Sequence, residues 1–178
     1  MRDDSEIAEQ SATETEAQPS FVTARRPVVS ATTAIGVAIA ALVVDQISKA
    51  IAVGWLAHGP VDLPGPISLR LVANRGILMG IPAPLWVVFA ATAVLLIVSV
   101  RAFPTATPAR AVGLGLAIGG ALGNLVDRLV QRGGFPDAAV VDWITWSSGP
   151  TFNLADVFLI VGVILAWGSA ENTMREVS

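Results

Sequence analysis

Two short phrases of the sequence, GNLVDR and FNLADV, place an asparagine three residues before an aspartate in apolar surroundings. These residues are Asn124 and Asp127 in the first phrase, and Asn153 and Asp156 in the second. Two carboxyl groups that are close enough to share one proton can hydrolyse an amide, because the ionised group activates a water while the protonated group hydrogen-bonds the carbonyl under attack. The repeated spacing therefore raises the question of whether Asp127 and Asp156 form such a pair.

A third aspartate, Asp142 in the stretch VVDWI, competes for the same role. Only 14 positions separate it from Asp156, and no basic residue lies between Gly133 and Asp142. Asp127, in contrast, is followed directly by Arg128. An aspartate that a cation holds in its ionised form is poorly suited to sharing a proton. The residues alone leave two pairings open, Asp127 with Asp156 or Asp142 with Asp156.

The composition places these acids in an integral membrane protein. Hydrophobic residues make up 53% of the 178 residues and charged residues only 14%, which is too apolar for a soluble domain of this length. Residues 1–18 are the exception, with six acids against one arginine. We expect residues 1–26 to form a disordered acidic tail. The absence of cysteine excludes disulfides, thiolate metal sites and cysteine nucleophiles.

Four apolar segments are long enough, or nearly so, to cross a bilayer as helices, which takes about 20 residues. Four spans put both termini on one side, and six arginines on that side against three in the opposite loops place the termini in the cytoplasm. The predicted fold is an all-α membrane protein of four transmembrane helices, followed by a cytoplasmic tail over residues 171–178. The predicted spans, within a domain of residues 27–170, are Val28–Ile51, Leu85–Val100, Ala111–Val130 and Phe152–Ala170.

The segments between the spans and the third span itself carry further local signals. The outer loops, residues 54–83 and 131–151, contain the partly alternating stretches ISLRLV and AAVVDWITW, which predict short strands. In the third span Gly115, Gly119 and Gly123 recur every four residues. Small residues at this spacing form a ridge on which a neighbouring helix can pack closely.

Three of the spans carry polar side chains at the same outer depth. They are Asp45 and Lys49 in the first span, Asn124, Asp127 and Arg128 in the third, and Asn153 and Asp156 in the fourth. An ionisable group inside a membrane is costly unless it is paired or hydrated, so this convergence predicts a functional site. Asp45 and Lys49 also have a structural interpretation, because they are spaced for a helical ion pair.

At this point the residues resemble a known family, bacterial lipoprotein signal peptidase or signal peptidase II, which are intramembrane aspartic proteases. Five motifs carry the resemblance in order over most of residues 30–170: DQISK, NRGILMG, GGALGNLVDR, VVDW and FNLAD. The resemblance implies a four-helix bundle with an extracytoplasmic β-rich cradle, and a catalytic dyad of Asp142 and Asp156. It implies that the following residues bind substrate or support the site: Asp45, Lys49, Asn74, Gly76, Asn124, Asp127, Arg128 and Asn153.

The resemblance also implies the substrate and the setting. The substrate would be a diacylglyceryl-modified prolipoprotein, cleaved just before its lipidated cysteine without metal or cofactor. We expect prolipoproteins and membrane lipid as partners, no nucleic acid, a monomer, and a site on the extracytoplasmic face of the bacterial inner membrane. Met79 stands where the family commonly has an aromatic residue and Val157 where it commonly has a small one. Both departures bear on the shape of the substrate pocket.

The sequence lacks residues that other hydrolytic mechanisms require. A serine protease needs a base, and the single histidine, His58, falls in an outer-loop turn. A zinc peptidase would need histidine ligands that the sequence does not contain. The alternative from another class is a small proton-coupled transporter component with Asp45, Asp127 and Asp156 as a relay. A relay would need acids across the whole membrane, whereas here they gather near one face.

Overall fold

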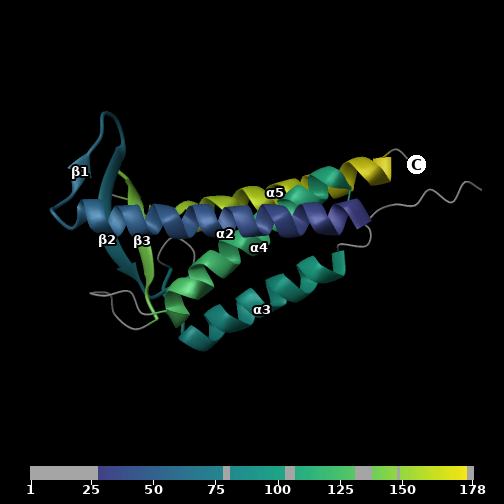
Figure 1. Cartoon of the computed structure of the whole chain (residues 1–178), viewed down its shortest axis with the longest axis horizontal. Coiled ribbons are helices and arrows are strands. Elements are labelled where there is room, and N and C mark those ends of the chain that lie inside the picture. Colours follow the sequence, from purple (N-terminus) through teal and green to yellow (C-terminus); the bar gives the residue numbers. More distant parts are fainter. Residues whose placement is uncertain (1–27, 78–80, 103–106, 131–137, 148, 176–178) are drawn as a thin grey trace, which may run out of the picture.

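The computed structural model describes residues 28–77, 81–102, 107–130, 138–147 and 149–175. Its elements follow the order α2, β1, β2, α3, α4, β3, β4, α5. The helices are α2 (Val28–Leu56), α3 (Leu85–Ala102), α4 (Pro108–Leu129) and α5 (Leu154–Arg175). Figure 1 shows α2, α4 and α5 packed together along the long axis, with α3 diverging from them and the strands gathered at one end.

The helices confirm the prediction of a mostly helical membrane protein. Residues Ala31–Leu56 of α2, all of α3 and all of α4 are long and apolar enough to cross a membrane, and α5 contains the shorter apolar stretch Leu154–Gly168. The largest departures from the predicted bounds are at the ends of two helices: α2 continues to Leu56 instead of Ile51, and α5 continues to Arg175 instead of Ala170, into the predicted tail. The acidic tail of residues 1–26 lies outside the described residues.

The start of α4 follows from its local sequence. The side chain of Thr107 accepts a hydrogen bond from the backbone N–H of Arg110 at 3.3 Å, and Pro108 occupies the first position of the helix. A threonine cap satisfies one of the otherwise unpaired N–H groups of the first turn, and proline fits there because it has no N–H to lose. Thr107 and Pro108 therefore set where α4 begins. The polar residues of α4 lie near its other end.

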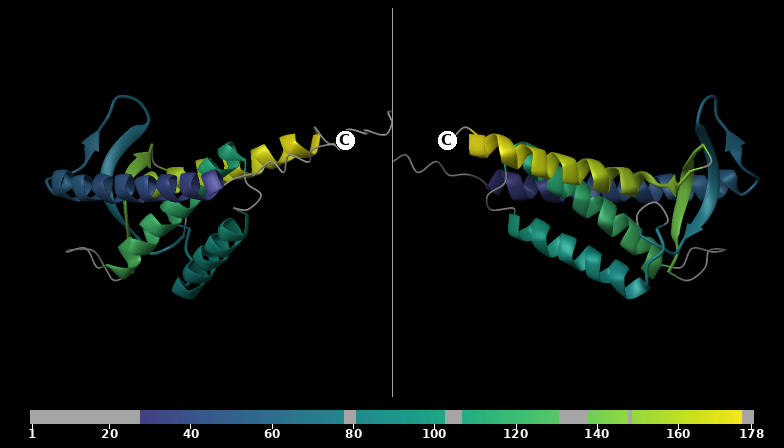
Figure 2. Two further views of the ribbon diagram at one scale, coloured as in Figure 1. Left: turned by 45° about the vertical axis from the view of Figure 1, so that its right-hand side comes forward. Right: turned by 180° about the vertical axis from the view of Figure 1, so that it is seen from behind.

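The sheet is antiparallel, with its four strands in the order β1, β2, β3, β4. They are β1 (Val61–Asp62), β2 (Ile67–Asn74), β3 (Val140–Trp146) and β4 (Thr151–Phe152). The stretches predicted as strands form β2 and β3, and their register places Val72 opposite Asp142 and Asn74 opposite Val140. In the views of Figure 2 the sheet lies across one end of the helices. This position brings residues of the outer loops to the polar ends of the spans.

Close packing of α4 depends on its glycines, as predicted. A Cβ atom at Gly115 or Gly119 would lie 2.6 Å from the carbonyl oxygen of Ala34 or Ala38 on α2. At Gly123 it would lie 2.5 Å from Oδ2 of Asp45. Any side chain at these glycines would force α2 away from α4 and would separate the polar residues of the two helices.

Candidate active site

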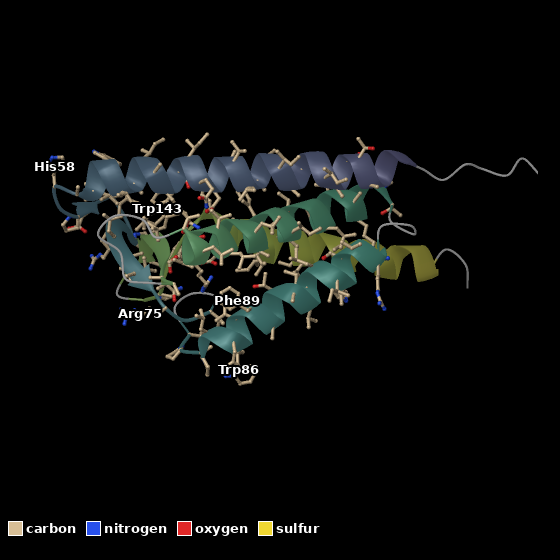
Figure 3. All side chains as sticks on the ribbon, turned by 60° about the horizontal axis from the view of Figure 1, so that its bottom comes forward. His58, Arg75, Trp86, Phe89 and Trp143 are labelled. Atoms are coloured by element: carbon tan, nitrogen blue, oxygen red, sulfur yellow. The ribbon has the colours of Figure 1, made fainter. Side chains whose placement is uncertain are left out.

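The polar residues of α2, α4 and α5 meet those of the sheet at the sheet end of the bundle, where Trp143 and Arg75 are labelled in Figure 3. The structure brings together all the residues that the sequence predicted for the site. Nearly all are buried although they are charged or strongly polar. The buried side chains of this kind are Asp45, Lys49, Asn74, Asp127, Arg128, Asp142, Asn153 and Asp156. Burial on this scale is tolerable only because the groups bind one another.

Lys49 is the electrostatic centre of one half of the site. Its Nζ lies 2.8 Å from Oδ2 of Asp45 and 2.9 Å from Oδ2 of Asp127, and it donates to Oδ1 of Asn124 at 2.9 Å. The predicted ion pair of Asp45 with Lys49 is confirmed. The cation bound to Asp127 is Lys49 of another helix. The sequence offered Arg128 as a cation for Asp127, although adjacent helical residues need not pair.

The two aspartates of this ion cluster also hold the backbone near the other acids. Oδ1 of Asp45 accepts a hydrogen bond from the N–H of Ala155 at 3.0 Å, and Oδ2 of Asp127 accepts one from the N–H of Val141 at 3.1 Å. Each of these N–H groups belongs to the residue directly before Asp156 or Asp142. The ion cluster therefore fixes the start of α5 and the start of β3 relative to each other.

Arg128 points to a different part of the site. Its guanidinium donates to the carbonyl oxygen of Asn124 at 3.1 Å and to that of Gly76. Gly76 is itself held by a hydrogen bond from its N–H to Oδ1 of Asn74 at 2.7 Å. Arg128 thus ties the segment after β2 to the end of α4.

Asp142 and Asp156 are joined through asparagine amides. Nδ2 of Asn153 donates to Oδ1 of Asp142 at 2.6 Å and to Oδ1 of Asn124 at 3.0 Å, and Nδ2 of Asn124 donates to Oδ1 of Asp156 at 2.8 Å. Oδ2 of Asp142 accepts from Nδ2 of Asn74 at 2.9 Å. Oδ2 of Asp156 is buried and has no hydrogen-bond partner among the described residues.

The environment of Asp142 favours its neutral form. Burial, and after it the neighbouring charge of Asp156, raise the pKa of this carboxyl from 3.8 to about 7. The amide bonds from Asn74 and Asn153 oppose the rise without cancelling it. Two acids whose charges repel each other in a buried site tend to retain one proton between them near neutral pH. This arrangement can perform general acid and general base catalysis together.

Two cavities flank these acids. The helix cavity, of about 230 Å³, lies between α3, α4 and α5 and is lined by Asp156, Arg128 and mostly apolar side chains. The sheet cavity, of about 410 Å³, is lined by the end of β2, by Asp142 and by Arg75. Asn74 lines both cavities. A chain that crossed from one cavity to the other would pass the two aspartates.

Comparison with known proteins identifies the family. Residues 37–170 match the family model described as signal peptidase (SPase) II. The chain belongs to the signal peptidase II family. It is 39% identical over 136 residues to a lipoprotein signal peptidase of Bifidobacterium longum strain NCC 2705, an alignment that covers 72% of this chain and 73% of the relative. It is 37% identical over 135 residues to one of Streptomyces griseus, covering 74% and 69%.

Solved structures support the same relationship. A bacterial membrane enzyme determined by the in meso method at 2.3 Å resolution superposes with a TM-score of 0.67 and 26% identity, over 82% of this chain and 91% of the other. A second such enzyme, at 1.9 Å resolution, gives a TM-score of 0.63 and 27% identity over 78% and 92%. Membership of the signal peptidase II family makes the chain a membrane peptidase.

Within this signal peptidase site, sequence reasoning missed one side chain and two backbone groups. Gln46 donates to Oδ2 of Asp45 at 3.1 Å and to the carbonyl oxygen of Gly123 at 3.1 Å. Its place inside the motif DQISK was the available signal. The N–H groups of Ala155 and Val141 gave no signal, because backbone donors look the same at every position.

His58 and Val157, which were also named from the sequence, fall outside the site. His58 is exposed beyond the end of α2, as Figure 3 shows, and does not reach the acids. Val157 is exposed as well. Met79 lies outside the described residues. No group of three or more potential metal ligands occurs in the parts of the chain that the structure describes.

Proposed function

We propose that the chain is an intramembrane aspartic endopeptidase that removes signal peptides from diacylglyceryl-modified prolipoproteins by cutting just before the lipidated cysteine. Asp142 and Asp156 form the catalytic dyad in this proposal. The observation that carries it is the link between these two buried carboxyls through the hydrogen-bonded amides of Asn153 and Asn124, with a cavity on either side. Asp45 and Asp127 are bound to Lys49 and are less suited to the chemistry.

The proposed reaction needs no covalent intermediate. The ionised member of the dyad takes a proton from a water, whose oxygen attacks the scissile carbonyl carbon. The protonated member donates a hydrogen bond, then its proton, to the carbonyl oxygen. When the tetrahedral intermediate collapses, the first aspartate gives the proton it took from water to the cysteine nitrogen and the C–N bond breaks. The carbonyl re-forms as one hydroxyl of the intermediate returns its proton to the second aspartate. The dyad thereby returns to its starting state with one proton.

The surrounding residues have distinct proposed roles. Asn74, Asn124 and Asn153 orient the carboxyls through the amide bonds described above. Arg128 lines the helix cavity beside Asp156 and holds Gly76, which lines the sheet cavity. Asp45, Lys49 and Asp127 form the supporting ion cluster.

The membrane supplies much of the positioning in this proposal. We place α2, α3, α4 and α5 as four spans of the bacterial inner membrane, with both termini in the cytoplasm and the sheet on the extracytoplasmic face. A lipid-anchored cysteine would keep its scissile bond close to the membrane surface, at the end of the helices where Asp142 and Asp156 lie. Holding a reacting bond at the catalytic groups removes much of the entropic cost of bringing them together. We propose that the protein acts as a monomer on its own.

Mutation of the acids tests the assignment. Purified protein in lipid or detergent is incubated with a diacylglyceryl-modified prolipoprotein, and cleavage is followed by gel shift. We expect Asp142→Asn and Asp156→Asn to lower the rate by about 100-fold or more, because each removes a proton-transfer group. Asp62→Asn is the matched control, since Asp62 lies on β1 with its side chain 86% exposed.

A fourth variant separates the two pairings that the sequence left open. We expect Asp127→Asn to retain measurable turnover, because this residue binds Lys49 and Val141 instead of substrate. If Asp142→Asn cleaves the substrate and Asp127→Asn does not, the dyad is instead Asp127 with Asp156.

A further inference from the structure

The two cavities beside the dyad differ in character and in location. The helix cavity is lined by side chains of three helices, among them Val88, Leu95 and Leu159, and is mainly apolar. The sheet cavity lies at the end of β2 beside β3 and β4, outside the helices, and contains Arg75, Asp142 and Thr151. The part of a substrate that stays in the bilayer suits the first cavity, and the part that leaves the bilayer suits the second.

We infer that the sheet cavity binds the residues that follow the lipidated cysteine, and that Arg75 favours an acidic side chain among them. This inference rests on the proposed function, in which the signal peptide and the diacylglyceryl group lie in the membrane while the remaining chain extends away from it. The only part of the substrate outside the membrane is then the polypeptide that follows the lipidated cysteine, on the extracytoplasmic side. The sheet cavity is the space next to Asp142 that lies on this path.

Arg75 is the residue that gives the sheet cavity its preference for an acidic side chain of the substrate. It is exposed, and no hydrogen bond or ion pair ties it to another side chain in the described part of the protein. In Figure 3 it projects from the end of β2, away from the helices. A guanidinium presents five donors in a fixed plane and binds carboxylates through two parallel hydrogen bonds. An acidic side chain of the substrate is the partner that matches these donors.

The other charged residue of the sheet cavity does not cancel this preference. Asp142 is only 1% exposed and lies on the floor of the cavity, bound by Asn74 and Asn153. Arg75 stands at the exposed edge. A substrate carboxylate extending outward meets the guanidinium first, while the dyad retains a proton that reduces its repulsion.

The experiment compares matched substrates on the intact membrane protein. Three diacylglyceryl-modified prolipoproteins differ only in the residue after the cysteine, which is Asp, Asn or Lys, and kcat/KM is measured for each. We expect wild type to prefer Asp over Asn by about two- to fivefold, the range of an exposed ion pair. In Arg75→Glu the order of Asp and Lys reverses. Salt at about 1 M brings the ratios close to one, because exposed charges are screened.

A control variant separates a local contact from overall charge. Arg70 is also exposed and lies on β2, the strand that ends directly before Arg75, but it lines a different cavity near Asp62. Arg70→Glu changes the net charge equally and should leave the Asp to Lys ratio unchanged. Arg75→Gln should bring that ratio toward one without reversing it.

The outcomes distinguish this inference from the proposed function. If all three substrates are cleaved and the ratio is the same in wild type and Arg75→Glu, the Arg75 subsite is wrong and the peptidase assignment stands. If wild type cleaves none of them, the proposed function fails and the subsite fails with it.

Discussion

The effect of replacing Asp142 by asparagine on the stability of the protein should be more favourable at high pH than at low pH. The folded-state pKa of this carboxyl is about 7, above its ordinary 3.8, so the folded protein keeps a proton that the unfolded chain has released. Below pH 3.8 this group does not penalise folding. As pH rises toward 7 the folded state progressively loses stability relative to the unfolded chain.

The size of the effect follows from these two pKa values. Between about pH 5 and pH 8 the wild type should lose roughly 2–3 kcal/mol through Asp142. Asparagine cannot titrate, so Asp142→Asn does not share this loss. The new amide nitrogen faces the Nδ2 donor of Asn74 or Asn153, so one hydrogen bond is lost at a cost of about 1–3 kcal/mol in folding stability. This cost does not vary with pH. The difference between the two pH values therefore isolates the titration.

Thermal unfolding in detergent measures the effect. Tryptophan fluorescence is a suitable signal because Trp143 is adjacent to Asp142 on β3. The Tm difference between Asp142→Asn and wild type should be about 5–10 °C larger near pH 8 than near pH 5. Asp62→Asn removes an exposed carboxylate and should show no such trend. A Tm difference for Asp142→Asn that is equal at both pH values would refute a burial-raised pKa at this position.

Two further predictions concern the scaffold. Lys49→Met leaves Asp45 and Asp127 buried without their cation, so we expect a loss of about 3–5 kcal/mol in stability and a fall in kcat larger than the change in KM. A Tm and kcat equal to those of wild type would show that the ion cluster supports neither. Gly119→Ala should lower stability by about 1–3 kcal/mol, because its Cβ would lie 2.6 Å from a backbone oxygen of α2. Gly36→Ala, with nothing within 4 Å, is its matched control in Tm measurements and should be neutral or slightly stabilising.

The fold was largely predictable because a bilayer imposes simple requirements. Apolar length predicts helices, and α3 and α4 lie close to their predicted bounds. Alternation predicts strands, and β2 and β3 formed where the outer loops alternate. The position of α3 was not predictable, because divergence from the bundle depends on side-chain packing that periodicity does not encode. The helix cavity, which depends on that divergence, was therefore missed.

The site was predictable as a set of residues but not as a set of bonds. Depth in the membrane indicates which polar residues can meet, since unpaired charges there are costly. It does not indicate which partner each will choose. The sequence offered Arg128 as a cation for Asp127, while the angle of about 100° between neighbouring helical residues already indicated that the two need not pair. Lys49 fills the place because the glycines of α4 bring α2 close enough for its ammonium to contact Asp127.

The two similar phrases form different hydrogen bonds because they occupy opposite ends of their helices. Asn153 precedes α5 and caps it, since its Oδ1 accepts a hydrogen bond from the N–H of Asp156 at 3.1 Å. The cap commits its oxygen to the helix and leaves its Nδ2 to donate to Asp142. Asn124 lies near the end of α4, where no helical N–H is unpaired and a cap has no use.

The orientation of Asn124 is set by Lys49 instead. An ammonium can only donate, so Asn124 must turn its oxygen toward Lys49 and its Nδ2 toward Asp156. The reversed amide would place two donors together and two acceptors together. The buried cation on α2 therefore determines which atom contacts Asp156, and in this way the ion cluster helps to orient the proposed dyad without contacting Asp156 itself.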